Sequence, residues 1–335
     1  MDISAHYLGI ELRNPLVASA SPLASTVDGV KRLAGAGVAA VVLPSLFEEE
    51  LRRQAAQDAA LAQAGTESFA ESLSYFPADA DAEPGPRQYL SLVERAAAAV
   101  DVPVIASLNG VTPGGWTDYA TALEQAGAAG IELNIYHLPA DPLTPGRDVE
   151  QRHIDVLTTI KAVVGVPVAV KLSPYFSSVG EMALRLDRAG ADGLVLFNRF
   201  LQPDIDPESL TVTTGFGLSS PAEGRLPRAW IALLAGRVKA SLGASAGVED
   251  AADVVAYLLA GADVVMTTSS LLRHGPEHAT VLLDGLTAWM ARKSFRTLRD
   301  VRGMLAIPAD HGEAARERAS YVDALRAADR GGGPW

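Results

Sequence analysis

Cysteine is absent from this chain of 335 residues, and that absence excludes several kinds of chemistry at once. Without a thiol the chain can form no disulfide, no thiolate metal site and no cysteine nucleophile or base. No apolar run approaches the roughly 18 residues that a membrane-spanning helix needs, so we expect no membrane partner. The amino terminus lacks the charged-then-apolar pattern of a signal peptide, and we therefore expect a cytoplasmic location.

Positive charge is also scarce. The chain has 28 basic and 40 acidic residues, which gives a net charge of -12. Proteins that bind nucleic acid carry basic stripes, so we expect no nucleic-acid partner. No two histidines or carboxylates stand at the spacing of metal ligands, and we expect no metal. Apolar residues make up 48% of the chain, which is enough to bury a large core.

A repeated junction organises the chain. The triplet Ala-Gly-Ala occurs at 34–36, 126–128, 189–191 and 260–262, each time after a helix-like stretch and shortly before an apolar run. Glycine supplies the left-handed conformation that ends a helix, and small neighbours let helix and strand approach closely. The apolar runs are nearly continuous, which is typical of parallel strands that are covered on both faces.

These units predict an α/β protein, a (β/α)8 TIM barrel, and the alternative is an open doubly wound sheet. We expect one domain over residues 1–325 and a disordered tail over 326–335. The eight strands are expected at 15–21, 39–46, 102–108, 130–136, 167–173, 193–198, 241–246 and 263–268.

Two insertions follow the second and the sixth strands, over 47–88 and 199–226. Within the latter, SLTVTTGFGLSS (209–220) predicts a short β-hairpin with glycines at its bends. Both insertions lie on the strand-to-helix side, where barrel enzymes keep their active sites.

Lys171 stands inside the apolar run VAVKLSP, at the end of the fifth predicted strand. A buried ammonium group is costly unless it meets an anion or a strong acceptor. We therefore expect either a cation that faces a cofactor or substrate, or a structural ion pair.

The last two strands end in hydroxyl-rich sequences, ASAGVED and MTTSSLLRHG. Loops at these positions form the usual phosphate site of barrels, although ordinary helix caps would give the same pattern. His137 follows the fourth strand and is either a general base or a hydrogen-bonded structural residue. Arg199 follows the sixth strand and forms either a bidentate contact with an acidic substrate or a surface salt bridge. We expect no role for the other five histidines.

Seven landmarks occur in order along nearly the whole chain. They are RNPLVASAS, ASLNG, IELNI, VAVKLSPYF, LFNRF, GLSSP and LLAGADVVMTTSSLLRHGP. With these landmarks the chain resembles the dihydroorotate dehydrogenase family of FMN barrels, and especially its soluble, dimeric branch. The resemblance implies FMN as cofactor, hydride transfer by the flavin, a small-molecule substrate and a homodimer.

The resemblance also implies roles for individual residues. Lys171 matches the lysine that lies against the flavin ring and stabilises its reduced anion. Asn109, Asn134 and Asn198 match asparagines that contact FMN or substrate, and Arg199 stands beside the last of them on the substrate side. The ribityl-phosphate is expected at Ser220, Gly247, Thr268 and Ser269, and the isoalloxazine at Ala20, Ser21 and Ser45.

Departures from the family pattern occur on the substrate side and in the phosphate loops. His137 replaces the cysteine or serine base, and Pro44 replaces a second lysine. The 138–140 stretch replaces an expected asparagine, and Ala244, Ala246 and Thr268 replace glycines of the phosphate loops. We expect an FMN-dependent oxidoreductase that acts on a small, acidic substrate, which need not be dihydroorotate. Two other interpretations remain: a flavin-free isomerase or lyase that acts on a phosphorylated substrate, with Lys171 as an electrostatic or Schiff-base lysine, and a non-catalytic FMN-binding protein.

Overall fold

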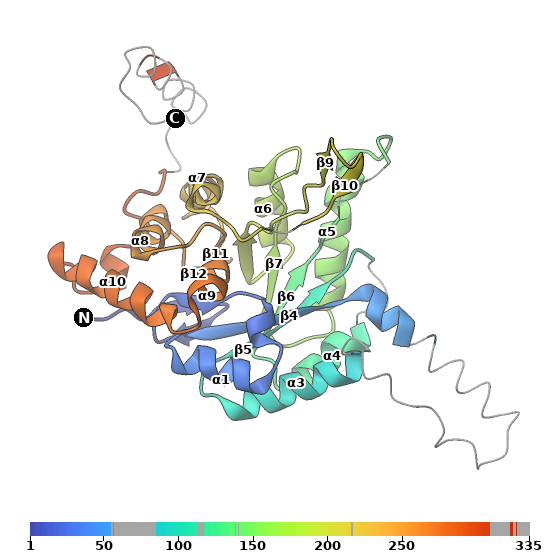
Figure 1. The fold of residues 1–335 in the computed structure, drawn as a ribbon, viewed down its shortest axis with the longest axis horizontal. Helices are drawn as coiled ribbons and strands as arrows, with labels where there is room; N and C mark the ends of the chain where they lie inside the picture. Colours follow the sequence, from blue (N-terminus) through green and yellow to red (C-terminus); the bar gives the residue numbers. More distant parts are fainter. Residues whose placement is uncertain are drawn as a thin grey trace, which may run out of the picture.

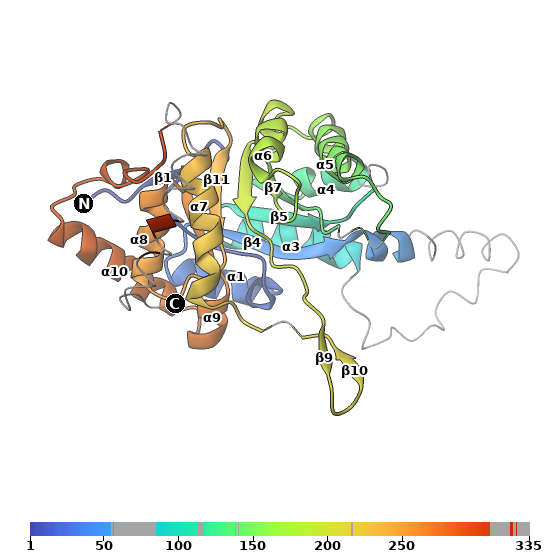
Figure 2. The ribbon, with the colours of Figure 1, turned by 90° about the horizontal axis from the view of Figure 1, so that it is seen from above.

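Eight parallel strands close into a barrel (Figures 1 and 2). The computed structural model describes residues 1–54, 56, 85–112, 117–137, 139, 141–215, 217–308, 322–323 and 326. Around the ring the strands follow the order β11-β12-β3-β4-β5-β6-β7-β8. Their bounds are Leu16–Ala18 (β3), Ala40–Phe47 (β4), Val104–Asn109 (β5), Gly130–Asn134 (β6), Val168–Lys171 (β7), Gly193–Leu196 (β8), Ser241–Ser245 (β11) and Val264–Thr267 (β12). All eight predicted strands are present, so the barrel prediction is confirmed and the open sheet is excluded.

Helices surround this barrel. The described ones are α1 (Val27–Gly35), α3 (Pro86–Ala99), α4 (Thr117–Gln125), α5 (Gly146–Lys161), α6 (Val179–Arg188), α7 (Arg225–Leu234), α8 (Ala251–Ala260), α9 (Ser269–His274) and α10 (His278–Arg292). Three short 3-10 helices are η1 (Pro22–Ala24), η2 (Pro221–Gly224) and η3 (Leu298–Asp300). No helix in the described part combines the length and the apolar character needed to cross a bilayer.

The glycines of the repeated junction end helices as predicted in three of four cases. Gly127, Gly190 and Gly261 have φ values of +92°, +96° and +117°. At the first junction the prediction is wrong, because α1 continues through Gly35 and Gly37 takes the left-handed conformation, with φ +106°. The sequence there offers two glycines two residues apart: α1 ends at the first, Gly35, and the second, Gly37, takes the left-handed conformation after the helix.

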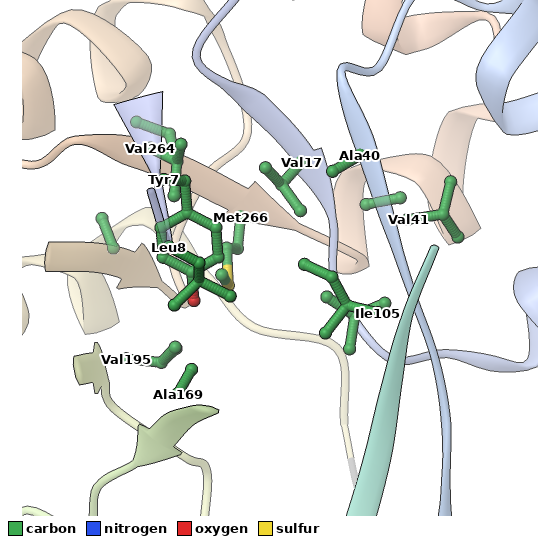
Figure 3. Packing of buried hydrophobic residues seen from close by; sticks show 14 of the residues in the cluster. Tyr7, Leu8, Val17, Ala40, Val41, Ile105, Ala169, Val195, Val264 and Met266 are labelled. Atoms are coloured by element: carbon green, nitrogen blue, oxygen red, sulfur yellow. The ribbon is translucent and has the colours of Figure 1, made fainter. Parts of the chain in front are cut away.

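A hairpin that the sequence did not predict fills the amino-terminal end of the barrel. Its strands are β1 (Ala5–Tyr7) and β2 (Ile10–Leu12), and Tyr7 and Leu8 lie among the inward-facing side chains of the barrel (Figure 3). Space for them comes from small residues on the strands: a Cβ at Gly193 would lie 2.6 Å from Leu8 Cδ2. Tyr7 and Leu8 thus pack the barrel interior at its amino-terminal end.

The second hairpin lies in the insertion after β8, but earlier than predicted. It pairs β9 (Asp204–Asp206) with β10 (Thr211–Thr213) and projects away from the barrel (Figure 2). The prediction placed the bends at glycines after residue 213, and this is wrong. The bend forms before β10 because the Asp206 carboxylate accepts hydrogen bonds from the backbone N–H groups of Glu208 and Ser209.

The insertion predicted over 47–88 and the tail predicted over 326–335 lie mostly outside the described residues. The single domain over 1–325 therefore stays a prediction.

Two glycines of the repeated junction allow a matched test of this packing. A Cβ at Gly261 would lie 2.5 Å from Ala235 Cβ, on a backbone with φ +117°, whereas a Cβ at Gly35 would meet nothing within 4 Å. We expect Gly261→Ala to lower the free energy of unfolding by about 1–3 kcal/mol, through strain and overpacking. Gly35→Ala should leave it unchanged or raise it by up to ~1 kcal/mol, since alanine favours the helix. Urea denaturation measures both, and equal losses would contradict this account of the junctions.

Candidate functional site

A cavity of about 350 Å³ lies at the carboxyl ends of β3, β7, β8, β11 and β12. We call it the Lys171 cavity. Polar and charged side chains in its wall come from all five of these strand ends and from the segment before η2. They are Ser19, Lys171, Asn198, Arg199, Ser219, Ser245, Thr267, Thr268 and Ser269. The volume is within the usual range for cofactor and small-ligand sites.

Lys171 projects into the barrel and not into the helix layer. Its Nζ lies 3.4 Å from Ser19 Oγ, which belongs to the opposite side of the ring, since β3 and β7 are four strands apart. The same Nζ lies 3.3 Å from Glu132 Oε1 on the neighbouring strand β6. Lys171 therefore has both of the features that the sequence left open: it lines a ligand-sized cavity, and it forms a buried ion pair.

Glu132 is a residue that sequence reasoning missed. Its side chain is 1% exposed, and its second carboxylate oxygen has no hydrogen-bond partner among the described residues. A signal was available, because Glu132 is the one charged residue in the strand GIELN and stands two positions before Asn134. In a strand, residues two apart share a face, so this spacing places the carboxylate on the same side as Asn134.

Serine hydroxyls and backbone N–H groups form a cradle at one end of the Lys171 cavity. Ser219 donates a hydrogen bond from its backbone N to Ser269 Oγ, at 2.9 Å, and its own Oγ lies 2.9 Å from the same atom. Gly247 N donates to Ser219 Oγ at 3.3 Å. Thr268 Oγ1 donates to Ser19 O at 3.1 Å, which ties the end of β12 to the end of β3. We call Ser219, Gly247, Thr268 and Ser269 the hydroxyl cradle.

Backbone conformation at the cradle requires small residues. Gly247 has φ +66°, and a Cβ there would lie 2.4 Å from the backbone N of Gly224. Ala246, which replaces a glycine of the family pattern, has φ +75°, a conformation that is unfavourable for a residue with a Cβ.

Ser220 does not line the Lys171 cavity, although its neighbour Ser219 does. Instead Ser220 begins η2 in a capping box, and its backbone N donates to Glu223 Oε1 at 2.8 Å. Ser219 was missed because two adjacent serines in GLSSP are indistinguishable until the path of the loop is known.

Some of the predicted asparagines and of the predicted residues near β3 and β4 line the Lys171 cavity, and others do not. Asn198 lines the cavity and donates from Nδ2 to Asn134 Oδ1 at 2.7 Å. Asn109 is the register partner of Asn134 and is buried. Ala20 also lines the cavity. Ser21 and Ser45 do not line it: Ser21 precedes η1, and Ser45 Oγ lies 2.8 Å from Ser107 Oγ.

Arg199 lines the Lys171 cavity but is held by protein groups. Its Nε lies 2.8 Å from Glu223 Oε2, and its Nη1 donates to Gly217 O at 2.6 Å. The structure therefore contains the salt bridge that the sequence left as one alternative, and this salt bridge fastens the end of β8 to η2.

His137 lies in a separate cavity of about 120 Å³, together with Glu150, Ser173 and Ser177. Burial, and then the charge of Arg152, hold the pKa of His137 below its usual value, so its neutral form is favoured. The loop after β6 carries the imidazole to this second cavity, and His137 does not line the Lys171 cavity.

His153 on α5, to which the sequence analysis gave no role, is the most perturbed histidine in the described part of the chain. It is 1% exposed, its Nδ1 lies 2.9 Å from Val149 O, and its ring makes an edge contact with Phe176. Burial is the main cause that lowers its pKa to about 4.

This shift predicts a pH-dependent loss of stability. Between pH 6.5 and about 4 the unfolded chain binds a proton at His153 that the folded protein does not, so the free energy of unfolding falls as the pH falls. By pH 4 the loss should approach about 3 kcal/mol. His153→Gln should remove this part of the slope, as measured by urea denaturation from pH 8 to pH 4.

The comparison at pH 8, where the imidazole is neutral in both states, gives the packing cost of the substitution alone. An unchanged difference between the two proteins across the whole pH range would show that His153 titrates normally.

The fold and the site together define a TIM barrel with a ligand-sized cavity at the carboxyl ends of its strands. Comparisons with known proteins agree. A model of the family described as dihydroorotate dehydrogenase matches residues 80–290. The putative dihydroorotate dehydrogenase A (fumarate) of Aeropyrum pernix is 29% identical over 227 residues, which are 66% of this chain and 74% of the relative. The catalytic subunit of dihydroorotate dehydrogenase B (NAD(+)) of Methanothermobacter thermautotrophicus is 27% identical over 313 residues, 88% of this chain and 95% of the relative. The chain belongs to the dihydroorotate dehydrogenase family.

Proposed function

We propose that this chain is an FMN-dependent oxidoreductase. The observation that carries the proposal is Lys171, whose amine lies inside the barrel at one wall of the cavity while the hydroxyl cradle forms another part of it. A ligand that fits has an anionic group for the cradle and an electron-accepting ring for the amine. FMN has both. At Gly247 a Cβ would lie 2.4 Å from Gly224 N, so a residue without a Cβ is needed for this loop to close against η2 and form the cradle.

Different residues of the cavity would contact different parts of FMN. In this proposal the hydroxyl cradle holds the phosphate. Ser220, which begins η2, fixes the position of its neighbour Ser219. Ala20, Lys171 and Asn198 lie where the ring would be. FMN, when bound, supplies a ring that accepts or gives a hydride. Lys171 orients the ring and balances the negative charge that reduction places on it.

The substrate side carries different groups from those of a dihydroorotate enzyme. We propose that the amides of Asn134 and Asn198 orient a small, acidic substrate, with Arg199 beside them in its ion pair to Glu223. His137, which lines the second cavity, would accept the proton, because its lowered pKa keeps it neutral near pH 7. Asn109, Ser21 and Ser45 remain predicted contacts of FMN. The homodimer and the cytoplasmic location also remain predictions.

The relatives are named for dihydroorotate, but we propose a different substrate for this chain. Proline stands at position 44 in place of a family lysine, and the residues after His137 lack the expected asparagine. In the family pattern those groups belong to the residues that recognise the substrate. Without these groups, the cofactor-binding residues of this chain match the family pattern better than its substrate-binding residues do.

The direct test of the cofactor uses the purified protein. We expect it to be yellow and to release FMN on denaturation. Gly247→Ala should weaken FMN binding at least tenfold, because its Cβ would push the cradle away from η2. The control is Gly9→Ala, which also changes a glycine of positive φ, +74°, but has open space around it and lies at the other end of the barrel.

A colourless protein that takes up no added FMN would overturn the proposal. In that case borohydride trapping with carbonyl substrates would test the flavin-free lyase alternative. Equal FMN affinities of the two glycine variants would remove the cradle from the phosphate site.

The substrate proposal has its own anaerobic test. Dithionite should bleach the flavin bands, whereas dihydroorotate should bleach them at least a hundredfold more slowly than it does in the family's pyrimidine-pathway enzymes. Rapid bleaching by dihydroorotate would assign the parent activity to this chain. FMN that resists reduction by dithionite would favour a non-catalytic binding protein.

A further inference from the structure

The barrel interior contains a carboxylate that the proposed reaction does not use. Glu132 lies on β6, and its Oε1 is 3.3 Å from Lys171 Nζ on β7. The register aligns Asn134 with Lys171 and Glu132 with Ala169, so Glu132 is two residues deeper in the barrel on the same inward face. The amine therefore lies between the cavity above it and the carboxylate below.

Lys171 supplies the only cation in contact with Glu132 among the described residues. Among the described residues the other carboxylate oxygen of Glu132, Oε2, has no hydrogen-bond partner. The hydroxyl of Tyr7, which packs inside the amino-terminal end of the barrel (Figure 3), has none either. After burial, the negative charge of Glu132 is the largest cause that raises the pKa of Tyr7 well above its usual value. Glu132 thus exerts an electrostatic effect inside the barrel, and Lys171 is the group that compensates it.

An amine that is paired with a carboxylate is a weaker electrostatic partner for a third group than an amine alone. Ser19 Oγ, the other contact of Lys171 Nζ, is neutral and cannot quench its charge. The field that Lys171 directs into the cavity is therefore reduced by Glu132. The long lysine side chain is also held at one wall of the cavity by these two contacts.

We propose that Glu132 is a positioning residue that fixes Lys171 against the bound flavin and sets the flavin's reduction potential lower than an unpaired lysine would. This inference rests on the proposed function, since it requires FMN in the Lys171 cavity. The inference gives the IELNI landmark a second functional residue besides Asn134. Glu132 weakens the field of Lys171 and so makes the reduced flavin a stronger reductant.

The test measures the affinities of oxidised and reduced FMN, and from them the midpoint potential, in isosteric variants. Glu132→Gln removes the negative charge and leaves the side-chain shape. We expect the affinity for reduced FMN to rise at least tenfold relative to oxidised FMN, which is about 30 mV in a two-electron potential. Glu132→Asp, whose shorter carboxylate lies farther from Nζ, should shift the ratio in the same direction by at least twofold.

The control is Asp263→Asn. Asp263 also pairs a largely buried carboxylate with a cation, Arg302 at 2.7 Å, but it precedes β12 at the opposite end of the barrel. Its substitution should leave the affinity ratio within twofold of the original protein. If Glu132→Gln does not fold, the comparison with Glu132→Asp decides the question, and an unchanged ratio there overturns the proposal.

A double variant asks whether Glu132 acts through Lys171. K171M/E132Q removes both charges together, so it leaves no unpaired ion in the barrel. We expect its affinity ratio to fall at least tenfold below that of the original protein, opposite in direction to E132Q. A double variant that matches E132Q would show that Glu132 acts without the lysine. A protein that binds no FMN would defeat the proposed function, whereas bound FMN with an unchanged ratio in E132Q defeats this inference alone.

Discussion

The structure depends on one buried ion pair at the axis of the barrel. Lys171 and Glu132 are 9% and 1% exposed, so each charge is removed from water and relies on the other. Burial of two ions is costly, and loss of either partner leaves an uncompensated charge, which typically costs about 3–5 kcal/mol. A pair of this kind is a weak device for stability. Its position at the wall of a ligand-sized cavity is therefore better explained by the charge that it presents to a ligand.

The rest of the barrel places that pair where it can act. Tyr7 and Leu8 pack the barrel interior at the amino-terminal end, and the Lys171 cavity lies at the carboxyl end. Left-handed glycines follow α1, α4, α6, α7 and α8, and a barrel strand begins soon after each of them. The cradle at the ends of β11 and β12 then faces the same cavity as the lysine on β7. Cation and cradle come from distant parts of the chain, and only closure of the ring brings them together.

Much of this could be predicted from sequence, because the signals are local. Apolar runs that follow helix-like stretches predicted all eight strands, and the charge inside VAVKLSP identified Lys171. The site residues that the sequence analysis missed or misplaced depend on contacts between helices, strands and loops. Glu132 became a partner of Lys171 only through the register between β6 and β7. Ser219 and not Ser220 lines the cavity because of the path of one loop. The salt bridge of Arg199 depends on where η2 places Glu223, and the loop after β6 carries His137 into its own small cavity.

The central claim is that Lys171 stands between a flavin and a buried carboxylate. A crystal structure of the protein grown with FMN tests it most directly. The account predicts the phosphate at the hydroxyl cradle and the ring against Lys171 Nζ, with Glu132 still in contact with the amine from below. A lysine turned away from the ring, or a ligand that occupies the cradle while the space above Lys171 is filled by side chains, would contradict it.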